Sequence, residues 1–505
     1  MTDPQRVMDA GSATVAAPAT ATPEVADPRR WRALAVTQFA AFMVLLDVSI
    51  VNVALPSIER GMAMPPATAQ WVISGYALTL GLTLVPAGRL GDALGRRRMF
   101  LIALTAFVVT SSLTGAAPNG DLLIAARLLQ GVAGGLLLPQ NSGLIQQLFR
   151  GAERGRAFGI LGGTVGLATA AGPVIGGVIL GVASGPDAWR WVFYVNLPIG
   201  LVALALAVRM VPATAGGGWR GGSHLDLPGS LLLGGGVLGL LVPLVDADNG
   251  GVTRLWWLWL LAVLLFSAFG WWEARTVRRG RQPLLDPRLL RTSGYVAGSA
   301  IGLVYFIGFT GIWMVLALFF QDGLGYSPLR SGLSVTPFAL GVAVSAVISG
   351  RLVSRLGRWL TVIGLTATVS GLIATALVLR HVTGDAATWA TVGPLLVAGL
   401  GGGMVTSPNM TLTLQNVPVR MGGAAGGAVQ TAQRIGAAVG TATLATIFYH
   451  VLTHTGHDYS TAVSDTVLSA SGFMVLALLM ALADLARQRL RHPRRTAPQP
   501  QTHNI

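Results

Sequence analysis

The chain has 505 residues, of which 52% are hydrophobic and 11% are charged, and its mean hydropathy is +0.63. Soluble domains carry roughly a quarter charged residues, so this composition excludes an ordinary soluble protein and indicates one embedded in a lipid bilayer. The formal net charge is +15, but the basic residues stand at the ends of apolar stretches and form no basic and aromatic face, so nucleic-acid binding is not expected.

All 35 basic residues are arginines, because the sequence contains no lysine. A Walker A phosphate loop needs its lysine, so ATP hydrolysis by this chain is not expected. Schiff-base chemistry is excluded for the same reason, and the absence of cysteine excludes disulfides and thiol chemistry. We predict that the chain is not an enzyme and needs neither a cofactor nor a metal. The sequence gives no indication of an accessory protein.

Apolar stretches recur along the chain after an alanine-, threonine- and proline-rich start. Residues 1–28 contain no apolar run that could serve as a signal peptide, so we expect a disordered tail there. Most of the later stretches are long enough to cross about 30 Å of hydrocarbon as helices. We predict about fourteen such helices, near residues 32–54, 68–87, 99–117, 122–143, 157–181, 190–210, 227–245, 255–272, 295–319, 330–349, 359–379, 388–411, 422–447 and 467–486.

The arginines are distributed unevenly among the connections between these helices. Alternate connections, together with the two tails, hold roughly 28 of the 35 arginines. Because basic residues stay on the cytoplasmic side of a membrane, we expect both termini to be cytoplasmic. An even number of helices agrees with that orientation.

A short glycine- and arginine-rich segment occurs twice. Residues 88–98 read Gly-Arg-Leu-Gly-Asp-Ala-Leu-Gly-Arg-Arg-Arg, and residues 350–358 read Gly-Arg-Leu-Val-Ser-Arg-Leu-Gly-Arg. Both copies share Gly-Arg-Leu and Leu-Gly-Arg at the same spacing, which indicates two related halves. Internal repetition in a membrane protein is typical of a transporter that rocks around a central site. The alternative is chance similarity between two cytoplasmic turns.

The positions of the two copies predict the domain organisation. The first copy follows the second predicted helix, and the second copy follows the tenth. Two halves of six helices would place the second copy after the eighth helix, so two additional helices must lie between the halves. We assign them to residues 227–245 and 255–272, which follow a glycine-rich linker at 214–223. We therefore divide the chain into a cytoplasmic tail (1–28), an N-terminal six-helix half (29–211), a linker with two inserted helices (212–292), a C-terminal six-helix half (293–486) and a basic cytoplasmic tail (487–505).

Several motifs resemble those of the major facilitator superfamily, specifically its fourteen-helix drug:proton antiporter branch. The resemblance covers nearly all of residues 32–486 and rests on Leu46–Pro56, Gln70–Tyr76, the segment 88–98, Arg127–Gly131, Gly172–Gly177 and Trp189–Gly200. This chain departs from the family pattern at three places. Ala93 replaces a usual arginine, Ala168 replaces a usual glycine, and Ser354 replaces the acid in the second copy.

The resemblance implies an all-α integral membrane protein of the major facilitator fold, with two six-helix halves plus two inserted helices. It also implies export of hydrophobic drugs or antibiotics, cationic ones included, across a bacterial plasma membrane in exchange for protons by alternating access. One alternative is a dedicated exporter of a single secondary metabolite or self-resistance antibiotic. A more remote alternative is a membrane-embedded enzyme or sensor. Against it, the sequence has no His-Glu-x-x-His motif and no evident pair of intramembrane acids.

Only three ionisable residues stand clearly within apolar runs, namely Asp47, Arg127 and Arg434. Such groups are costly in a bilayer, so each is a functional candidate. We predict that Asp47 gains and loses the transported proton, the alternative being a permanent structural ion pair. Arg127 would tune an acid or hold an anionic partner, the alternative being hydrogen bonds to backbone carbonyls. Arg434 would either line the cavity or serve in packing.

Two motifs are expected to act on conformation. Asp92 can accept hydrogen bonds from a helix N-terminus. The resemblance implies that it latches the two halves, with the start of the helix after Arg420 as its partner, and we assign this latch to Gly88, Asp92, Gly95 and Arg96. An alternative for the arginines is a role in membrane orientation only. In the fifth helix the resemblance implies that Gly172, Pro173, Gly176 and Gly177 seal the halves in antiporters, the alternative being ordinary glycine packing.

Substrate contacts are expected from polar and aromatic residues that face a central cavity. The candidates are Asn52, Gln140, Asn141, Tyr305, Trp313 and Asn409. The sequence does not identify the substrate, because the specificity of a cavity is spread over many side chains.

Overall fold

The computed structural model describes residues 28–183, 185–212, 226–246, 250–292, 294–382 and 384–491. Nearly the whole of the predicted tail 1–28, the glycine-rich linker 214–223 and residues 492–505 lie outside the described residues. The described residues form helices joined by short connections and contain no strand.

Sixteen α-helices follow one another in the described part of the chain. In order they are α1 (Arg30–Met62), α2 (Pro66–Leu94), α3 (Arg96–Ala116), α4 (Gly120–Leu148), α5 (Gly151–Val182), α6 (Arg190–Tyr194), α7 (Asn196–Met210), α8 (Leu227–Val245), α9 (Gly251–Arg254), α10 (Trp257–Arg278), α11 (Tyr295–Leu318), α12 (Pro328–Leu356), α13 (Arg358–His381), α14 (Asp385–Thr413), α15 (Gly422–His454) and α16 (Tyr459–Arg491). Fourteen spans among them are long and apolar enough to cross a membrane, with α6 and α7 counted as one span, which confirms the predicted number.

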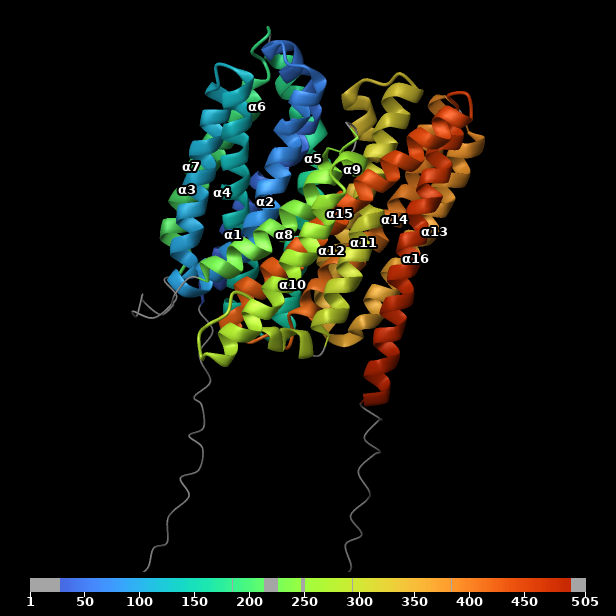
Figure 1. Cartoon of the computed structure of the whole chain (residues 1–505). Coiled ribbons are helices and arrows are strands. Elements are labelled where there is room, and N and C mark those ends of the chain that lie inside the picture. Colours follow the sequence, from blue (N-terminus) through green and yellow to red (C-terminus); the bar gives the residue numbers. More distant parts are fainter. Residues whose placement is uncertain are drawn as a thin grey trace, which may run out of the picture.

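The helices form two bundles with a helix pair beside them (Figure 1). Helices α1 to α7 pack on one another around buried Tyr76, Phe100 and Phe107, and helices α11 to α16 pack around buried Tyr305 and Phe448. The pair α8 and α10 pack mainly on each other, and α8 also contacts α2 and α15. This arrangement is the one expected for two six-helix halves with two inserted helices.

The two bundles meet along two pairs of helices. Helix α5 lies along α12, and α2 lies along α15. Glycines make this close packing possible: a Cβ atom on Gly159 would lie 2.9 Å from the backbone of Gly350. A side chain at such a position would force the helices apart.

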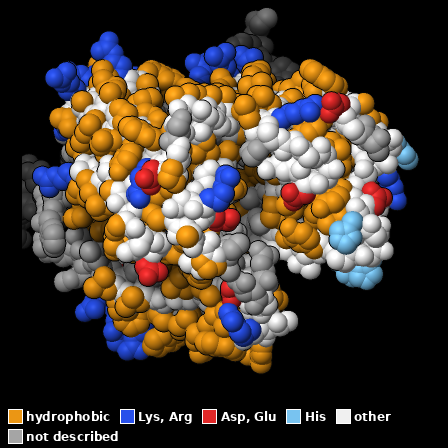
Figure 2. Space-filling model, turned by 90° about the horizontal axis from the view of Figure 1, so that it is seen from above, with side chains coloured by type: hydrophobic (Ala, Val, Ile, Leu, Met, Phe, Trp, Pro, Cys, Tyr) orange, Lys and Arg blue, Asp and Glu red, His pale blue; other side chains and the backbone are white. Residues whose placement is uncertain are grey.

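The start of α1 and the end of α16 lie at the same end of the bundle (Figure 1). We call this end the arginine-rich end, because Arg96, Arg154 and Arg358 stand there at helix starts. Seen from the opposite end (Figure 2), hydrophobic side chains form much of the outline and charged side chains are few and scattered. A largely apolar outer surface is what a lipid-facing protein requires.

The first glycine- and arginine-rich segment is mostly helical, not a long turn. Helix α2 continues to Leu94, so Gly88 and Asp92 lie inside it and only Gly95 separates it from α3. Gly95 has a φ of +95°, which an L side chain rarely adopts. The expected turn is therefore a single residue, because the preceding glycines pack against neighbouring helices and stay helical.

Candidate functional site

The centre of the N-terminal bundle holds a buried ion pair. The Arg127 Nη1 atom on α4 lies 2.7 Å from Asp47 Oδ2 on α1. The side chains of the two residues are 1% and 0% exposed, respectively. Removing one partner of such a pair leaves an uncompensated charge in a low-dielectric interior, which costs about 3–5 kcal/mol.

Amide and hydroxyl side chains complete the surroundings of Asp47. Its Oδ1 atom accepts hydrogen bonds from Gln130 Nε2 at 3.1 Å and from Asn196 Nδ2 at 2.8 Å. The same Asn196 amide donates to Ser111 Oγ at 3.0 Å, and Ser111 donates to the Phe193 carbonyl. The Asp47 carboxylate on α1 therefore accepts hydrogen bonds from α4 and α7, and all three helices belong to the N-terminal bundle. This set of contacts fits the ionised form of Asp47.

Arg127 uses both of the bonding modes that the sequence left open. Besides Asp47, it donates from Nη1 to Gln130 Oε1 at 2.9 Å and from Nε to the Val72 carbonyl at 2.9 Å. The Tyr76 ring covers the guanidinium, with the Cζ atom 4.1 Å from the ring centroid. The arginine is therefore held between an acid, a backbone carbonyl and an aromatic face.

Arg434 stands apart from this pair. It lies on α15, in the other bundle, and its Cβ faces Gly81 of α2. Its side chain is half-buried, and within the described part of the chain it forms no ion pair with an acid. Tyr76 lies within electrostatic reach of both Arg434 and Arg127. The three predicted intramembrane charges thus divide into a closed pair and a separate cation.

The segment 88–98 contacts the opposite bundle at the arginine-rich end. Asp92 accepts hydrogen bonds from the backbone N–H of Gly423 at 3.2 Å and of Ala424 at 3.1 Å, which begin α15. Arg96 donates to Asp92 Oδ1 at 2.8 Å and to the Val419 carbonyl at 2.7 Å. The carboxylate therefore joins α2, α3 and α15 at the helix end where the dipole favours a negative charge.

The two glycines of the assigned latch have different tasks. A Cβ atom on Gly88 would overlap the Gly423 carbonyl, so this position needs a residue without a side chain. Gly95 supplies the positive φ between α2 and α3 that places Arg96 at a helix start. Gln146 adds a further link across the bundles, donating from Nε2 to the Gly422 carbonyl at 3.1 Å.

The second copy of the segment is bonded differently. Ser354 is exposed, and Arg358 at the start of α13 pairs with Asp484 on α16 at 2.9 Å. Arg358 also donates to Asn409 Oδ1 at 2.6 Å. These partners belong to the same bundle, so Arg358 does not bridge the two bundles as Arg96 does.

The predicted glycine face on α5 serves two neighbours. A Cβ atom on Gly172 would overlap Ser49 of α1, and Gly176 faces Ile50 of the same helix. Gly177 faces Leu329 of α12, and Pro173 contacts Gly332 of that helix. Half of this motif therefore packs within its own bundle, and half contacts the opposite one.

The six substrate candidates do not lie together. Gln140 donates to the Ala87 carbonyl beside the Asp92 contact, and Asn141 accepts from Gln38 at 3.1 Å. Asn409 is held by Arg358, while Asn52 is exposed on α1. Gln140, Asn141 and Asn409 have hydrogen-bond partners inside the protein.

The two aromatic candidates lie on α11 in the C-terminal bundle. Tyr305 stacks on Phe309, and Trp313 packs edge-on against both Phe309 and Phe338.

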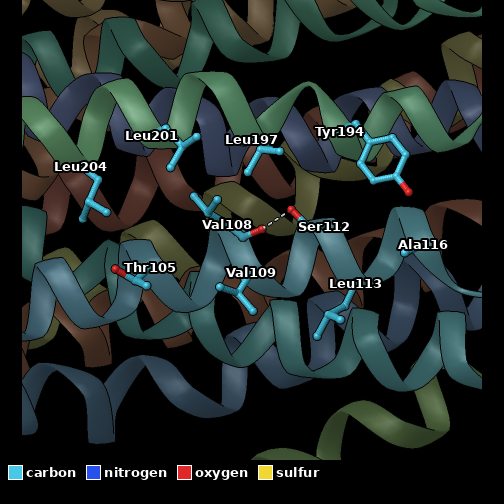
Figure 3. Close-up of a pocket in the computed structure, with 10 residues that line it drawn as sticks. All are labelled: Thr105, Val108, Val109, Ser112, Leu113, Ala116, Tyr194, Leu197, Leu201 and Leu204. Carbon is cyan, nitrogen blue, oxygen red and sulfur yellow. Dashed lines mark hydrogen bonds between the residues drawn. The ribbon is translucent and has the colours of Figure 1, made fainter.

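A groove of about 490 Å³ lies on the outer surface of α3 and α7 (Figure 3). Its walls are almost entirely apolar, and Val109, Leu113 and Leu201 are each more than half exposed. In a membrane-spanning protein such an outward apolar surface faces lipid. We therefore do not assign the substrate to this groove.

Two buried acids escaped the sequence analysis. Asp226 caps the start of α8, and Glu273 lies near the end of α10; they are 8% and 1% exposed. The sequence analysis looked for acids inside the apolar runs, and Asp226 lies just outside the candidate span Leu227–Leu244, so this buried pair was missed. Asp226 stands just outside an apolar run and Glu273 is followed by several arginines, so in sequence both look like solvated residues.

Comparisons with known proteins agree with this architecture. A family model described as the Major Facilitator Superfamily matches residues 38–441. A probable actinorhodin transporter of Streptomyces coelicolor is 35% identical over 469 residues, covering 90% of this chain and 79% of that protein. The puromycin resistance protein pur8 of Streptomyces alboniger is 37% identical over 430 residues, covering 83% of this chain and 82% of that protein.

Solved structures give the same fold. The proton:xylose symporter XylE aligns with a TM-score of 0.64 at 15% sequence identity, covering 90% of this chain and 95% of that one. At this identity the likeness concerns the fold alone. With the family match over most of the sequence and fourteen candidate spans, the chain belongs to the major facilitator superfamily of multi-pass membrane transporters.

Proposed function

We propose that the protein exports antibiotic-like small molecules from the cytoplasm of a bacterium, across its plasma membrane, in exchange for protons. The relatives named above for actinorhodin transport and puromycin resistance support the class of substrate. The arginine-rich end, which carries both described termini, would face the cytoplasm. The observation that carries the coupling to protons is the buried pair of Asp47 and Arg127.

The geometry suggests how a proton would act on this pair. With both Asp47 oxygens accepting hydrogen bonds, the ionised carboxylate is fully satisfied and balances the charge of Arg127. A proton entering at Oδ2 would remove the salt bridge and leave the arginine charge uncompensated. Arg127 cannot lose its own proton under ordinary conditions. Protonation would therefore loosen the contact between α1 and α4 at the centre of the N-terminal bundle, and this local change is what would couple proton binding to transport.

Arg434 bears on the charge of the substrate. The expectation of cationic drugs relied on Asp47 as a free negative charge, but its charge is taken up by Arg127. The remaining intramembrane cation on α15 has no acid partner among the described residues, and a cationic drug beside it would be repelled. We therefore favour hydrophobic substrates without a net positive charge.

A dedicated exporter of one antibiotic is the second candidate function. The two relatives are each named for a single compound, which favours this alternative. A panel of compounds in a pump-deficient host separates the two, because a dedicated exporter protects against one structural class and a multidrug exporter against several.

The test of proton coupling is the Asp47→Asn variant in that host. We expect at least about tenfold loss of protection, because the variant keeps the amide hydrogen bonds but loses the ionisable group. An uncoupler should abolish protection by the unmodified protein in the same way. Asp187→Asn is the matched control, since that carboxylate is 68% exposed and pairs with Arg190 at the surface. Protection by Asp47→Asn equal to that of the control, at equal membrane abundance, would contradict the proposal.

A further inference from the structure

The inserted helices carry a second pair of buried ionisable groups, and they are both acids. The carboxylates of Asp226, which caps the start of α8, and Glu273 on α10 converge on Gly229. A Cβ atom on that glycine would lie 2.5 Å from Asp226 Oδ2 and 2.7 Å from Glu273 Oε1. The two side chains are within hydrogen-bonding reach of each other. Two acceptor oxygens therefore face one another in a buried space.

Three of the four carboxylate oxygens of this pair, Glu273 Oε1 included, already have donors. Asp226 Oδ1 accepts from the Gly229 N–H at 2.9 Å and from Trp272 Nε1 at 2.8 Å. Glu273 accepts from the backbone N–H groups of Leu284 at 3.3 Å and Leu285 at 3.2 Å. Asp226 Oδ2 is the exception: it is buried and has no donor. One hydrogen atom is missing from an otherwise complete set of hydrogen bonds.

No cation in the described part of the chain balances these acids. Arg89 on α2 donates to Gln282, and Arg275 on α10 lies over the Trp271 ring. Helix α8 has no charged residue, and Arg434 of α15 lies farther along, against Gly81. In the connection after α10, Asp286 caps its own short helix, Pro287–Arg291. The charge repulsion within the pair must therefore be removed in another way.

We propose that Asp226 and Glu273 bind one proton between Asp226 Oδ2 and Glu273 Oε1, and that this proton closes a clasp between the inserted helices and residues 282–285. Two buried carboxylates side by side cannot both stay ionised without a counter-ion. A shared proton removes one negative charge and gives Oδ2 its hydrogen bond. Loss of the proton places two like charges in contact and pushes Glu273 away from the segment it holds.

The clasp connects to the helices that meet at the cytoplasmic end. Leu284 packs in a small cluster with Val85 of α2 and Phe269 of α10. Val85 stands two turns before Asp92, whose carboxylate joins α2 to α15. An alkaline cytoplasm would open the clasp and loosen this end of α2; the effect on transport rests on the proposed function, but the opening itself does not.

Cysteine labelling measures the opening directly, because the chain has no cysteine of its own. Leu284 is 2% exposed, so Leu284→Cys reacts with a water-soluble maleimide only when the segment detaches. Ala152→Cys, at an exposed position near the start of α5, corrects for the intrinsic pH dependence of the thiol reaction. In inside-out vesicles we expect the ratio of the two labelling rates to rise at least about fivefold between about pH 6 and about pH 9.

Asp226→Asn gives the deciding comparison. Its amide accepts the Gly229 and Trp272 hydrogen bonds and donates permanently to Glu273, so the ratio should stay low at both pH values. Asp246→Asn, at the opposite end of α8, is the matched control. Its labelling ratio should rise with pH as it does in the protein that carries only the reporter cysteine. If Leu284→Cys reacts already at low pH, Val85→Cys takes its place with the same expectation, because Val85 is 2% exposed and packs in the cluster with Leu284. A ratio that does not change with pH in the unmodified background, or that rises equally in Asp226→Asn, would overturn the proposal.

Discussion

The two copies of the glycine- and arginine-rich segment have similar backbones and different chemistry. Each places an arginine at a helix start directly after a glycine of positive φ, Gly95 at +95° and Gly357 at +52°. Each also brings a glycine of the preceding helix against the backbone of the other bundle. Gly88 meets Gly423 on α15, and Gly350 meets α5. The shared residues thus encode a helix break and a close approach.

The difference lies in the acid. Asp92 accepts hydrogen bonds from the opposite bundle, whereas Ser354 at the corresponding position is exposed and Arg358 is bonded within its own bundle. One interface therefore combines glycine packing with a charged contact, and the other has glycine packing without the corresponding acid. In this repeated fold, one acid therefore distinguishes an interface that has a carboxylate contact between the halves from one that lacks it.

The largest expected effect comes from removing the acid of the first copy. Asp92→Ala leaves Arg96 buried without its carboxylate and two N–H groups of α15 without an acceptor, a cost of about 3–5 kcal/mol to the contact between the bundles at the arginine-rich end. We expect drug efflux, normalised to membrane protein, to fall at least about tenfold. Ser354→Ala is the matched change in the second copy and should alter efflux less than about twofold. Equal effects of the two substitutions would remove the proposed distinction between the copies.

Smaller and equal effects are expected from the glycines that the copies share. Gly88→Ala and Gly350→Ala each place a methyl group against the backbone of the opposite bundle, so each should lower efflux by about threefold to tenfold and reduce thermal stability. Gly181→Ala is the control, because a Cβ atom there would meet nothing within 4 Å and alanine favours the helix. Gly88→Ala without any effect would show that the close approach is not needed for transport.

The sequence was sufficient for the parts of the fold that depend on local composition. Runs of apolar residues predicted the fourteen spans, and the resemblance led to α15 as the partner of Asp92. What it could not predict depends on packing between distant segments. Gln130 and Asn196 donate to Asp47 from two different helices, and Ser111 on a third accepts from Asn196, but nothing in their local sequence marks them as members of this network.

The polar substrate candidates illustrate the same limit. Gln140 and Asn409 were chosen because polar residues in apolar helices often line a cavity, but both are 2% exposed or less and bonded to protein groups. A buried polar group needs a partner whatever its function, so its presence in a helix does not distinguish a cavity wall from a contact between helices. Asp226 and Glu273 are the opposite case. Their local sequence suggests solvated residues, and only tertiary packing buries them.

The central claim, export coupled to proton entry through Asp47, is tested most directly with purified protein in liposomes. An outward substrate gradient should drive proton uptake in the opposite direction, read as a change of a trapped pH dye, and an imposed pH gradient should drive substrate against its own gradient. We predict that Asp47→Asn abolishes both movements while the Asp187→Asn control retains them. Substrate movement at an unchanged rate without any proton counterflow, or the same counterflow in Asp47→Asn, would contradict the account.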